Sequence, residues 1–265
     1  MKFFADTIIK PYIIESGYRR ICEIGASFGE NTDTLLGIES VAIDIIDPCL
    51  DADLGKKYQH DKRIQVHKDM SLNVLREMSG QFDCILIDGD HNWYTVYNEL
   101  RMIDERGLIK EGGTIFFHDV CWPYARRDMY YRPELIPPEF IHPYDRAGIV
   151  YGKSKLSNVS IANASLCNAI YEGGPRNGVL TAVEDFLKEN RGKYKFFRFE
   201  EEYGLGVLLK TVSTIANVTF NRYLLKAKSR IPLRRLKNVA SHKFPALYSS
   251  LTDLRNRTRR ALGNK

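Results

Sequence analysis

The feature that most constrains this chain is a regular alternation of short apolar runs with helical segments across residues 20–118. Strands that alternate with helices in this way form a parallel sheet that is covered on both faces. The expected strands are Arg20–Ile24, Val41–Asp44, Ile64–His67, Phe82–Asp88 and Gly113–Phe117. The sequence therefore predicts an α/β fold with a Rossmann-like parallel sheet, helices on both faces and right-handed crossovers.

The alternation stops at residues 121–178, which are rich in Pro, Tyr and Arg. A long irregular segment inside a compact domain is often functional, so we expect an ordered, lid-like insertion here. The pattern then predicts a helix at Val179–Glu189. Two further strands, Tyr194–Phe199 and Gly206–Leu209, are expected to close the sheet as an antiparallel pair.

The net charge of +6 is the sum of two parts of opposite sign. Residues 222–265 contain thirteen Lys or Arg and one acid, whereas the remainder carries a net charge of −6. We therefore divide the chain into a main domain, residues 1–215, and a basic C-terminal tail, residues 216–265. Basic amphipathic segments can lie on an anionic membrane surface, bind nucleic acid or pack on a partner subunit, and we favour the membrane surface.

Composition places the chain among ordinary globular proteins. Hydrophobic residues make up 44% and charged residues 27%, and no run of 18 apolar residues predicts a spanning helix. The five cysteines form no C-x-x-C pair, so neither a zinc ribbon nor a redox dithiol is indicated. Asp6 and Lys10 interrupt any signal-peptide core. We expect a cytoplasmic protein, with peripheral association at the inner face of the membrane through the tail.

A glycine-containing turn, Glu23–Gly29 (EIGASFG), follows the first expected strand. Ligands on open α/β sheets bind outside the carboxyl ends of the strands, and glycine lets the backbone approach them closely. The spacing differs from G-x-G-x-x-G, and no G-K-[ST] follows, so phosphate binding is not expected. The turn by itself could also be purely structural. Asp44 is expected to end the second strand, where it would be well placed to bind a ribose, and Asp69 follows the third.

This combination of a turn and two strand-end acids resembles class I S-adenosylmethionine-dependent methyltransferases over about residues 18–120. The resemblance implies that Gly25 and Gly29 flank the methionine part of the cofactor. It also implies that Asp44 binds the ribose and that Asp69 lies near the adenine. The full set of cofactor-binding candidates is Glu23, Gly25, Ala26, Gly29, Asp44, Asp69 and Asp88.

The segments Ile87–Tyr94 (IDGDHNWY) and Gly112–Val120 (GGTIFFHDV) make the resemblance more specific. Together they resemble the O-methyltransferases of bacterial sugar and polyketide tailoring, a group related to catechol-type enzymes. The resemblance implies a divalent ion, Mg or Mn, held by Asp88, His118 and Asp119. His118 departs from the carboxylate or amide usual in those relatives, and Mg prefers oxygen ligands. The alternative is that His118 and Asp119 hydrogen-bond to loops and to His91 without an ion.

Methyl transfer to a hydroxyl requires a base or a metal to help remove the proton. His91 is the leading candidate for the base, because its pKa class suits proton transfer near neutrality. Asp90 is the second candidate. The alternative roles are orientation or helix capping for His91 and helix capping for Asp90, a position that Asp favours.

The insertion supplies candidates for acceptor binding, since planar rings and forked guanidinium donors suit a sugar, a phosphate or a carboxylate. These candidates are Trp122, Arg126, Arg127 and Tyr130. The alternative is a lid pinned by salt bridges or a contact between subunits of a homo-oligomer. The loop Glu172–Gly178 has the same ambiguity: it could close over the acceptor or form a plain turn before a helix.

The sequence therefore predicts an S-adenosylmethionine-dependent O-methyltransferase that acts on a hydroxyl of a sugar or glycan-like acceptor. The acceptor would be a small molecule or a lipid-linked glycan in surface polysaccharide or secondary-metabolite biosynthesis. Two alternatives remain: a nucleic-acid methyltransferase that uses the basic tail, and a non-catalytic scaffold with a methyltransferase fold. The net charge of −6 outside the tail argues against the first, and the strand-end acids argue against the second.

Overall fold

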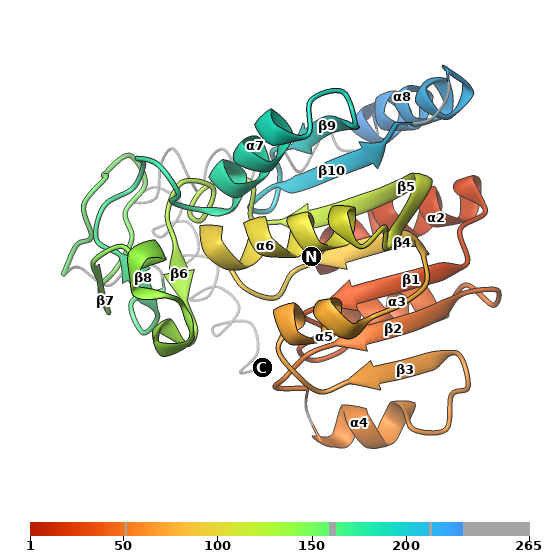
Figure 1. The fold of residues 1–265 in the computed structure, drawn as a ribbon, viewed down its shortest axis with the longest axis horizontal. Coiled ribbons are helices and arrows are strands. Elements are labelled where there is room, and N and C mark those ends of the chain that lie inside the picture. The colour runs from red at the N-terminus through yellow and green to blue at the C-terminus, as the bar shows by residue number, and fades with distance from the viewer. Residues whose placement is uncertain (51, 159–162, 212–213, 230–265) are drawn as a thin grey trace, which may run out of the picture.

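The computed structural model describes residues 1–50, 52–158, 163–211 and 214–229. A sheet with the strand order β3-β2-β1-β4-β5-β10-β9 forms their centre (Figure 1). The strands are β1 Arg20–Ile24, β2 Ala42–Ile46, β3 Ile64–His67, β4 Phe82–Ile87, β5 Ile109–His118, β9 Tyr194–Phe199 and β10 Leu205–Lys210. Strands β1 to β5 pair in parallel, and β10 pairs antiparallel with β5 and β9. The predicted fold class, including the closing antiparallel pair, is confirmed.

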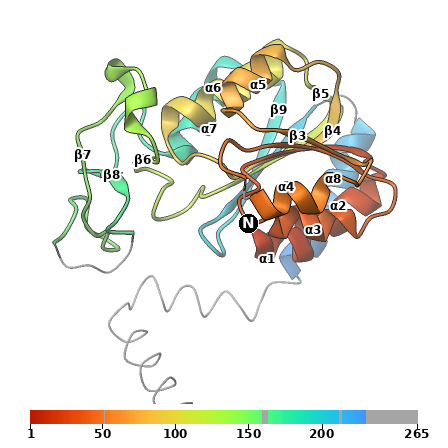
Figure 2. The same ribbon diagram turned by 90° about the horizontal axis from the view of Figure 1, so that it is seen from below.

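Helices cover both faces of the sheet because the central strands are apolar on both sides. Alternate residues of a strand point to opposite faces, so Ile21 packs in one hydrophobic cluster and Cys22 in the other. One face carries α1 Lys2–Phe4, the π-helical turn η1 Ala5–Ile9, α2 Lys10–Ser16, α3 Glu30–Leu36, α4 Ala52–Tyr58 and α8 Thr214–Ser229 (Figure 2). The other face carries α5 Ser71–Glu77, α6 Trp93–Glu105 and α7 Val179–Glu189.

The second strand runs further than the sequence predicts. Strand β2 continues past Asp44, because Ile45 and Ile46 are buried and pair with β1. Asp44 therefore lies inside the strand, and the prediction that it ends the strand is wrong. Asp47 is the first residue after β2 and is the acid at the carboxyl end.

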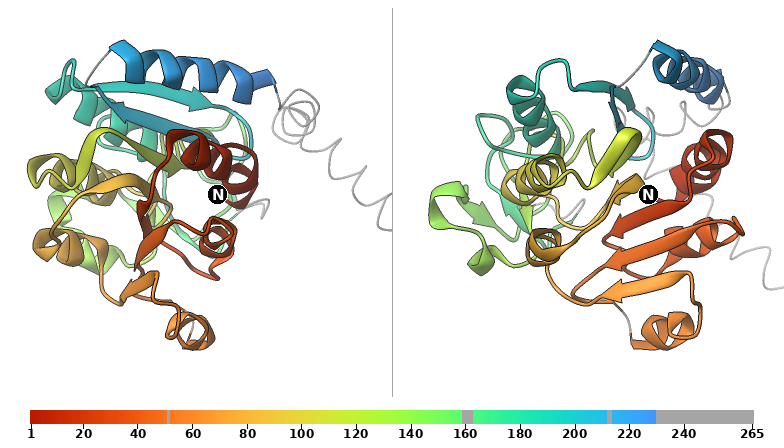
Figure 3. Two further views of the ribbon diagram at one scale, coloured as in Figure 1. Left: turned by 90° about the vertical axis from the view of Figure 1, so that its right-hand side faces the viewer. Right: turned by 45° about the vertical axis from the view of Figure 1, so that its right-hand side comes forward.

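Helix α8 corrects the predicted start of the tail. The boundary between residues 215 and 216 falls inside this helix, and Phe220, Tyr223 and Leu224 are buried in the core beside the N-terminal helices (Figure 3). Tyr223 Oη also donates a 2.6 Å hydrogen bond to the carbonyl of Ile8. The helix thus belongs to the main domain, while residues 230–265 of the predicted tail lie outside the described residues. Across the described ranges, no helix combines the length and the apolar character needed to cross a bilayer.

The insertion lies beyond the carboxyl ends of the central strands (Figure 1). It contains a small sheet in the order β6-β8-β7, formed by Met129–Tyr130, Cys167–Ala169 and Tyr144–Asp145, and the 3-10 turns η2 Pro133–Leu135 and η3 Pro138–Phe140. The buried Asp128 carboxylate accepts 2.7 Å hydrogen bonds from the backbone N–H groups of Trp93 and Gly178. Trp93 is the first residue of α6 and Gly178 directly precedes α7, so Asp128 fixes the insertion to both helices.

Candidate active site

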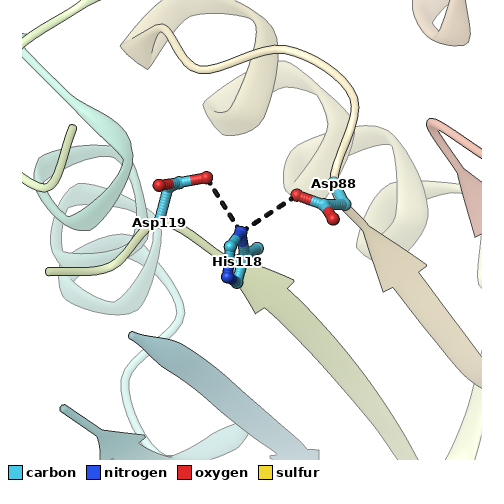
Figure 4. A group of neighbouring side chains, drawn as sticks. All are labelled: Asp88, His118 and Asp119. Carbon is cyan, nitrogen blue, oxygen red and sulfur yellow. Dashed lines mark ion pairs between the residues drawn. The ribbon is translucent and has the colours of Figure 1, made fainter. Parts of the chain in front are cut away.

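The carboxyl ends of the adjacent strands β4 and β5 bring Asp88, His118 and Asp119 together (Figure 4). His118 Nδ1 lies 3.2 Å from Asp88 Oδ1 and 2.9 Å from Asp119 Oδ2. His91, in the loop between β4 and α6, places Nε2 2.7 Å from the same Asp119 oxygen. We call Asp88, His91, His118 and Asp119 the acid–histidine cluster. All four were candidates from the sequence.

The backbone at Asp119 makes this convergence possible. Consecutive residues of an extended strand point to opposite faces of a sheet, so His118 and Asp119 could not meet in a continued strand. Asp119 instead adopts a left-handed conformation, with φ of 60°. A non-glycine residue seldom adopts this conformation, and such strain concentrates at functional sites. The turn brings the Asp119 carboxylate back onto the imidazole of its neighbour.

His118 has a polar partner for each ring nitrogen. Its Nε2 lies 2.9 Å from the backbone carbonyl of Glu202, which only accepts hydrogen bonds, so Nε2 carries a proton. Its Nδ1 faces the two carboxylates of Asp88 and Asp119. Burial favours the neutral ring, but the two carboxylates outweigh it and raise the pKa of His118 to about 10. Without an ion, the ring is therefore an imidazolium between two carboxylates.

Asp119 links the two histidines. Burial of its carboxyl group favours the neutral form, but the His118 and His91 rings outweigh it and hold the pKa of Asp119 well below its usual range. Burial likewise opposes protonation of His91, and the Asp119 carboxylate reverses this and raises the pKa of His91. The second ring nitrogen of His91, Nδ1, is buried without a hydrogen-bond partner among the described residues.

The Asp88 carboxylate has a further cationic neighbour. Its Oδ2 lies 3.1 Å from the amino group of Met1, and its Oδ1 faces His118. Burial favours the neutral acid, but His118 and the amino group outweigh it and lower the pKa of Asp88. The Asp88 carboxyl group is therefore ionised, the form that can bind a cation.

The donor atoms of Asp88, His118 and Asp119 fit a divalent ion. One ligand atom from each residue lies within 4.8 Å of the others. The Glu202 carbonyl holds the proton of His118 on Nε2, so Nδ1 has a free lone pair once its own proton leaves. Two carboxylates and one imidazole suit Mn, Fe or Zn better than Mg. The same atoms also form a closed network without an ion, so both predicted alternatives fit the geometry.

The glycine turn after β1 lies against the loop after β4. Gly25, Ser27 and Gly29 all have positive φ, at 84°, 49° and 74°. A Cβ on Gly25 would lie 2.4 Å from the Cα of Gly89, so only glycine allows the two backbones to approach this closely. Ala26, between these residues, is buried. The tight turn therefore lies beside the loop that carries the acid–histidine cluster.

Asp47 anchors this turn, although the sequence analysis did not select it. Its Oδ2 accepts a 2.7 Å hydrogen bond from the backbone N–H of Ser27, and its Oδ1 accepts one of 2.8 Å from Cys49. Asp44 instead pairs with His67 Nε2 at 3.0 Å and lies 3.9 Å from Arg20 Nε. The sequence AIDIIDP contains both acids. Ile45 and Ile46 extend the apolar run of the strand, and a strand predicted to include them would have ended at Asp47.

The other two cofactor candidates occupy different surroundings. Glu23 is buried at the end of β1, accepts a 2.5 Å hydrogen bond from Thr32 Oγ1, and leaves Oε1 without a partner in the described part of the chain. Burial raises the pKa of Glu23 to about 7. The Asp69 carboxylate, after β3, accepts hydrogen bonds from the Met70 N–H and from Asn73 at the start of α5.

Asp90 has the contacts of a helix cap. Its Oδ1 accepts a hydrogen bond from the His91 N–H at 3.0 Å, and its Oδ2 accepts one from Thr95 Oγ1 at 2.9 Å. Asn92 adds a 2.8 Å bond from the Thr95 N–H to its side chain. The geometry favours the capping alternative for Asp90 and leaves His91 as the candidate base.

Hydrogen bonds within the fold hold three of the four insertion candidates, Arg126, Arg127 and Tyr130. Arg126 donates two hydrogen bonds, of 2.6 and 2.7 Å, to Glu184 of α7. The buried Arg127 donates to the carbonyls of Ala169 and Ser154. Tyr130 Oη donates to Asp128 at 2.9 Å, and Trp122 packs edge-on against Tyr151. For Arg126, Arg127 and Tyr130 these contacts favour the alternative of a pinned lid.

Three tyrosines outside the list of site candidates lie against the acid–histidine cluster. The rings of Tyr124 and Tyr131 lie 5.5 and 5.9 Å from the His91 ring, and Tyr203 lies 6.2 Å from His118. Tyr131 is 57% exposed and Tyr203 45%, so both present ring surface to solvent beside the cluster. Tyr124 and Tyr131 lie in the Tyr- and Arg-rich segment that supplied the acceptor candidates, whereas no local pattern identifies Tyr203, which a loop distant in the chain brings to the site.

Comparison with known proteins places the site within a segment that matches a described family. Residues 22–120 match the family model described as a methyltransferase domain. A methyltransferase from Podospora anserina, solved with bound S-adenosylhomocysteine, is similar, with a TM-score of 0.50 and 15% identity over 77% of this chain and 76% of that chain. A putative caffeoyl-CoA O-methyltransferase from Staphylococcus aureus has a TM-score of 0.47 and 14% identity, over 78% of this chain and 83% of that chain. No curated protein matches the chain.

The segment 22–120 is therefore similar to a methyltransferase domain, and the likeness to the Podospora structure confirms the predicted fold. The matched segment begins in β1 and ends just after Asp119, so it contains the glycine turn and the whole acid–histidine cluster. The domain match supports the predicted enzyme class, a methyltransferase.

The Asp119–His91 contact predicts a measurable titration. In the Asp119→Asn variant, the midpoint of His91 should move to lower pH, because the carboxylate that raises its pKa is lost while burial continues to lower it. NMR titration of the imidazole resonances measures this, with His91 assigned from the spectrum of His91→Gln. Asp69→Asn is the control and should leave the midpoint unchanged. A midpoint that stays or rises in Asp119→Asn would contradict the assigned contact.

Proposed function

We propose that this chain is an S-adenosylmethionine-dependent O-methyltransferase in which His91 removes the proton from the acceptor hydroxyl. The observation that carries the proposal is the acid–histidine cluster beside the glycine turn of a methyltransferase domain. Buried carboxylates and imidazoles with shifted pKa values at strand ends are typical of catalytic sites. The proposal assigns the turn to the cofactor and the cluster to the acceptor.

The cofactor is proposed to lie across the turn Gly25–Gly29, with its methionine part between the two glycines. Asp47 takes the ribose role, because it is the buried acid at the end of β2 and already holds the turn through Ser27. The two ribose hydroxyls are donors that suit a carboxylate acceptor. Asp69, after β3, keeps its proposed place near the adenine. Glu23 connects the end of β1 to α3, which follows the turn, by accepting the hydrogen bond from Thr32.

The proposed reaction is an in-line displacement at the methyl group of the sulfonium. The acceptor oxygen forms the new bond to carbon, the carbon–sulfur bond breaks, and the electron pair returns to sulfur to give a neutral thioether. The proton of the hydroxyl passes to His91. Asp119 accepts from Nε2–H of His91, which leaves the lone pair of Nδ1 to receive that proton. Asp119 also stabilises the imidazolium that results.

A divalent ion fits the same proposal. Asp88, His118 and Asp119 would hold it, and when bound it would supply Lewis acidity that lowers the pKa of the acceptor hydroxyl. Binding would require the Nδ1 proton of His118 to leave, because that nitrogen is the ligand atom. Metal binding by this set is therefore expected to release a proton and to weaken as the pH falls.

The acceptor is proposed to be a sugar or glycan-like hydroxyl, in surface polysaccharide or secondary-metabolite biosynthesis. The exposed rings of Tyr131 and Tyr203 beside the cluster support this class, because flat apolar rings pack against the C–H face of a sugar. A flat phenolic acceptor would use the same rings. Which acceptor the enzyme methylates, a sugar or a phenol, therefore tests this part of the proposal separately from methyl transfer itself.

The tail is proposed to bring the enzyme to the cytoplasmic membrane surface, where a lipid-linked acceptor would be found. Residues 230–265 contain ten Lys or Arg and one acid, a net charge of +9. Each basic residue near an anionic surface contributes about 1 kcal/mol at most, and the attraction falls off within a Debye length. The membrane interaction is therefore expected to be strongly salt-dependent.

The first prediction concerns the cofactor. Calorimetry should show that the protein binds S-adenosylmethionine and that Asp47→Ala weakens binding about ten- to a hundredfold, since a hydrogen bond to a charged group is worth about 1.5–3 kcal/mol. Asp44→Ala is the matched control, from the interior of the same strand, and should change the affinity little. Absence of binding by the wild type, or a larger loss in Asp44→Ala, would refute the cofactor assignment.

The second prediction concerns the base. His91→Ala should lower the rate of S-adenosylhomocysteine formation by about 10²–10⁴, because the proton-transfer contribution is lost, and should leave cofactor affinity nearly unchanged. A panel of glycosides and catechols supplies the acceptors, and His67→Ala, a histidine on β3, is the control.

Treatment of the wild type with EDTA separates the metal alternatives. Inactivation that Mn restores indicates an ion at Asp88, His118 and Asp119, and unchanged activity indicates a base without a metal. A fully active His91→Ala variant would exclude His91 as the base in either case.

The third prediction concerns the tail. Full-length protein should bind vesicles that contain phosphatidylserine at low salt, and deletion of residues 230–265 should abolish this binding while cofactor binding persists. The deletion leaves α8 intact, so it spares the buried Tyr223 and Leu224. Sedimentation with vesicles at increasing salt provides the measurement. Full-length protein that binds an RNA or DNA duplex but ignores the vesicles would favour the nucleic-acid alternative.

A further inference from the structure

A groove of about 500 Å³ lies between α6, α7 and the turn η3, on the helical layer rather than at the strand ends. Figures 1 and 2 show α6 and α7 side by side on this face of the sheet. The groove is lined by aromatic rings from α6 and η3 and by charged side chains from α6, α7 and the loop before α7. None of the acid–histidine cluster lines it. The volume is in the range of small-molecule sites.

The aromatic side of the groove is a stack of parallel rings. Trp93 and Tyr97 stack at 4.6 Å with an interplanar angle of 8°, and Trp93 and Phe140 at 5.8 Å with 17°. Tyr94 packs against Phe140 at 4.9 Å. Trp93 is almost fully buried within this stack, whereas Tyr94, Tyr97 and Phe140 are half-buried. A flat ring can therefore extend the stack from the groove side.

Arg176 extends over these rings from the loop before α7. Its guanidinium carbon lies 5.4 Å from the Trp93 ring centre and 5.2 Å from that of Phe140. Stacking covers the face of the guanidinium but leaves its N–H edge free for an anion. No carboxylate of the described residues pairs with Arg176, which is exposed and lines the groove. Within the described part of the chain it is a cation without a counter-ion at the groove.

The loop is built to hold Arg176 in this position. Arg176 has a positive φ of 53°, a conformation that a non-glycine residue adopts at a cost. The neighbouring Asn177 fixes the loop: its side-chain N–H group donates to the carbonyls of Tyr171 and Gly173, and its side-chain oxygen accepts from the Asp128 N–H. The hydrogen bonds of Asn177 therefore hold the loop in a defined conformation, which a plain turn before a helix would not require.

The acids in the groove do not compensate Arg176. Asp185 accepts hydrogen bonds from Trp93 Nε1 at 2.9 Å and from Lys188 at 2.8 Å. Glu189 accepts one from Tyr97 Oη at 2.5 Å. A second cation at the groove, Arg101, lies 3.7 Å from an exposed carboxylate one helical turn away, that of Glu105. The groove thus offers a flat apolar wall and positive charge together.

We propose that this groove binds a nucleoside phosphate, with the base against the rings of Tyr94, Tyr97 and Phe140 and the phosphate at the N–H edge of Arg176. The chemistry follows from the two walls: a planar heterocycle extends the ring stack, and a phosphate matches the fork of a guanidinium. The site is separate from the proposed methyl-transfer centre, and the assignment does not depend on that function.

Calorimetry with uridine 5′-monophosphate tests the proposal. The titrations use the full chain with saturating S-adenosylhomocysteine, so that the nucleotide does not compete for the proposed cofactor site. Arg176→Gln should weaken binding at least about tenfold. Arg191→Gln, an exposed arginine between α7 and β9 and outside the groove, should bind like the wild type. Phe140→Leu should also weaken binding, because the ring surface is lost while the charge remains.

Two further ligands separate the two parts of the site. Uridine and inorganic phosphate should each bind at least about tenfold more weakly than uridine 5′-monophosphate, since each uses one wall of the groove. The proposal is overturned if the nucleotide does not bind or if phosphate alone binds equally well. It is also overturned if Arg176→Gln binds like the wild type, which is the result expected from binding to the basic residues 230–265. Unchanged melting temperatures of the variants verify their folding.

Discussion

The Asp119 carboxylate between two imidazoles is the interaction on which the rest of the site depends. It contacts His118 at 2.9 Å and His91 at 2.7 Å, and it raises the pKa of both rings while burial opposes this. Its left-handed backbone directs the side chain back toward the strand that precedes it. Removing this carboxylate would leave two buried histidines without their shared counter-charge and would free the ring of the proposed base.

The fold places this interaction next to the glycine turn, the proposed cofactor site, through one close backbone contact. Gly25 after β1 and Gly89 after β4 approach so closely that a Cβ on Gly25 would overlap the backbone of Gly89. Because β1 and β4 are adjacent in the sheet, the turn and the loop that carries His91 share the same edge. Asp128 then fixes the insertion to the starts of α6 and α7, so that Tyr124 and Tyr131 lie against His91.

The sequence predicts what depends on periodicity and strand ends, and it is least informative where distant loops meet. Strands β1, β3 and β9 and helix α7 have their predicted bounds, and the predicted metal-ligand candidates do converge. Asp44 was predicted to end its strand because the expected strand stopped two residues early, and the buried Ile45 and Ile46 carry β2 on to Asp47. The sequence left two roles open for Arg126 and Arg127 and could not identify their partners, because Glu184 and the carbonyls that they contact lie some thirty to sixty residues away.

The most direct test of the account is a crystal structure of the protein grown with S-adenosylhomocysteine and Mn, with anomalous data at the Mn edge. The account predicts that the ribose hydroxyls contact Asp47 and that the sulfur lies beside the acid–histidine cluster, with His91 facing the space next to it. An anomalous peak among Asp88, His118 and Asp119 would assign the metal-assisted route, and its absence the metal-free one. A cofactor bound elsewhere, or a sulfur remote from His91, would contradict the account.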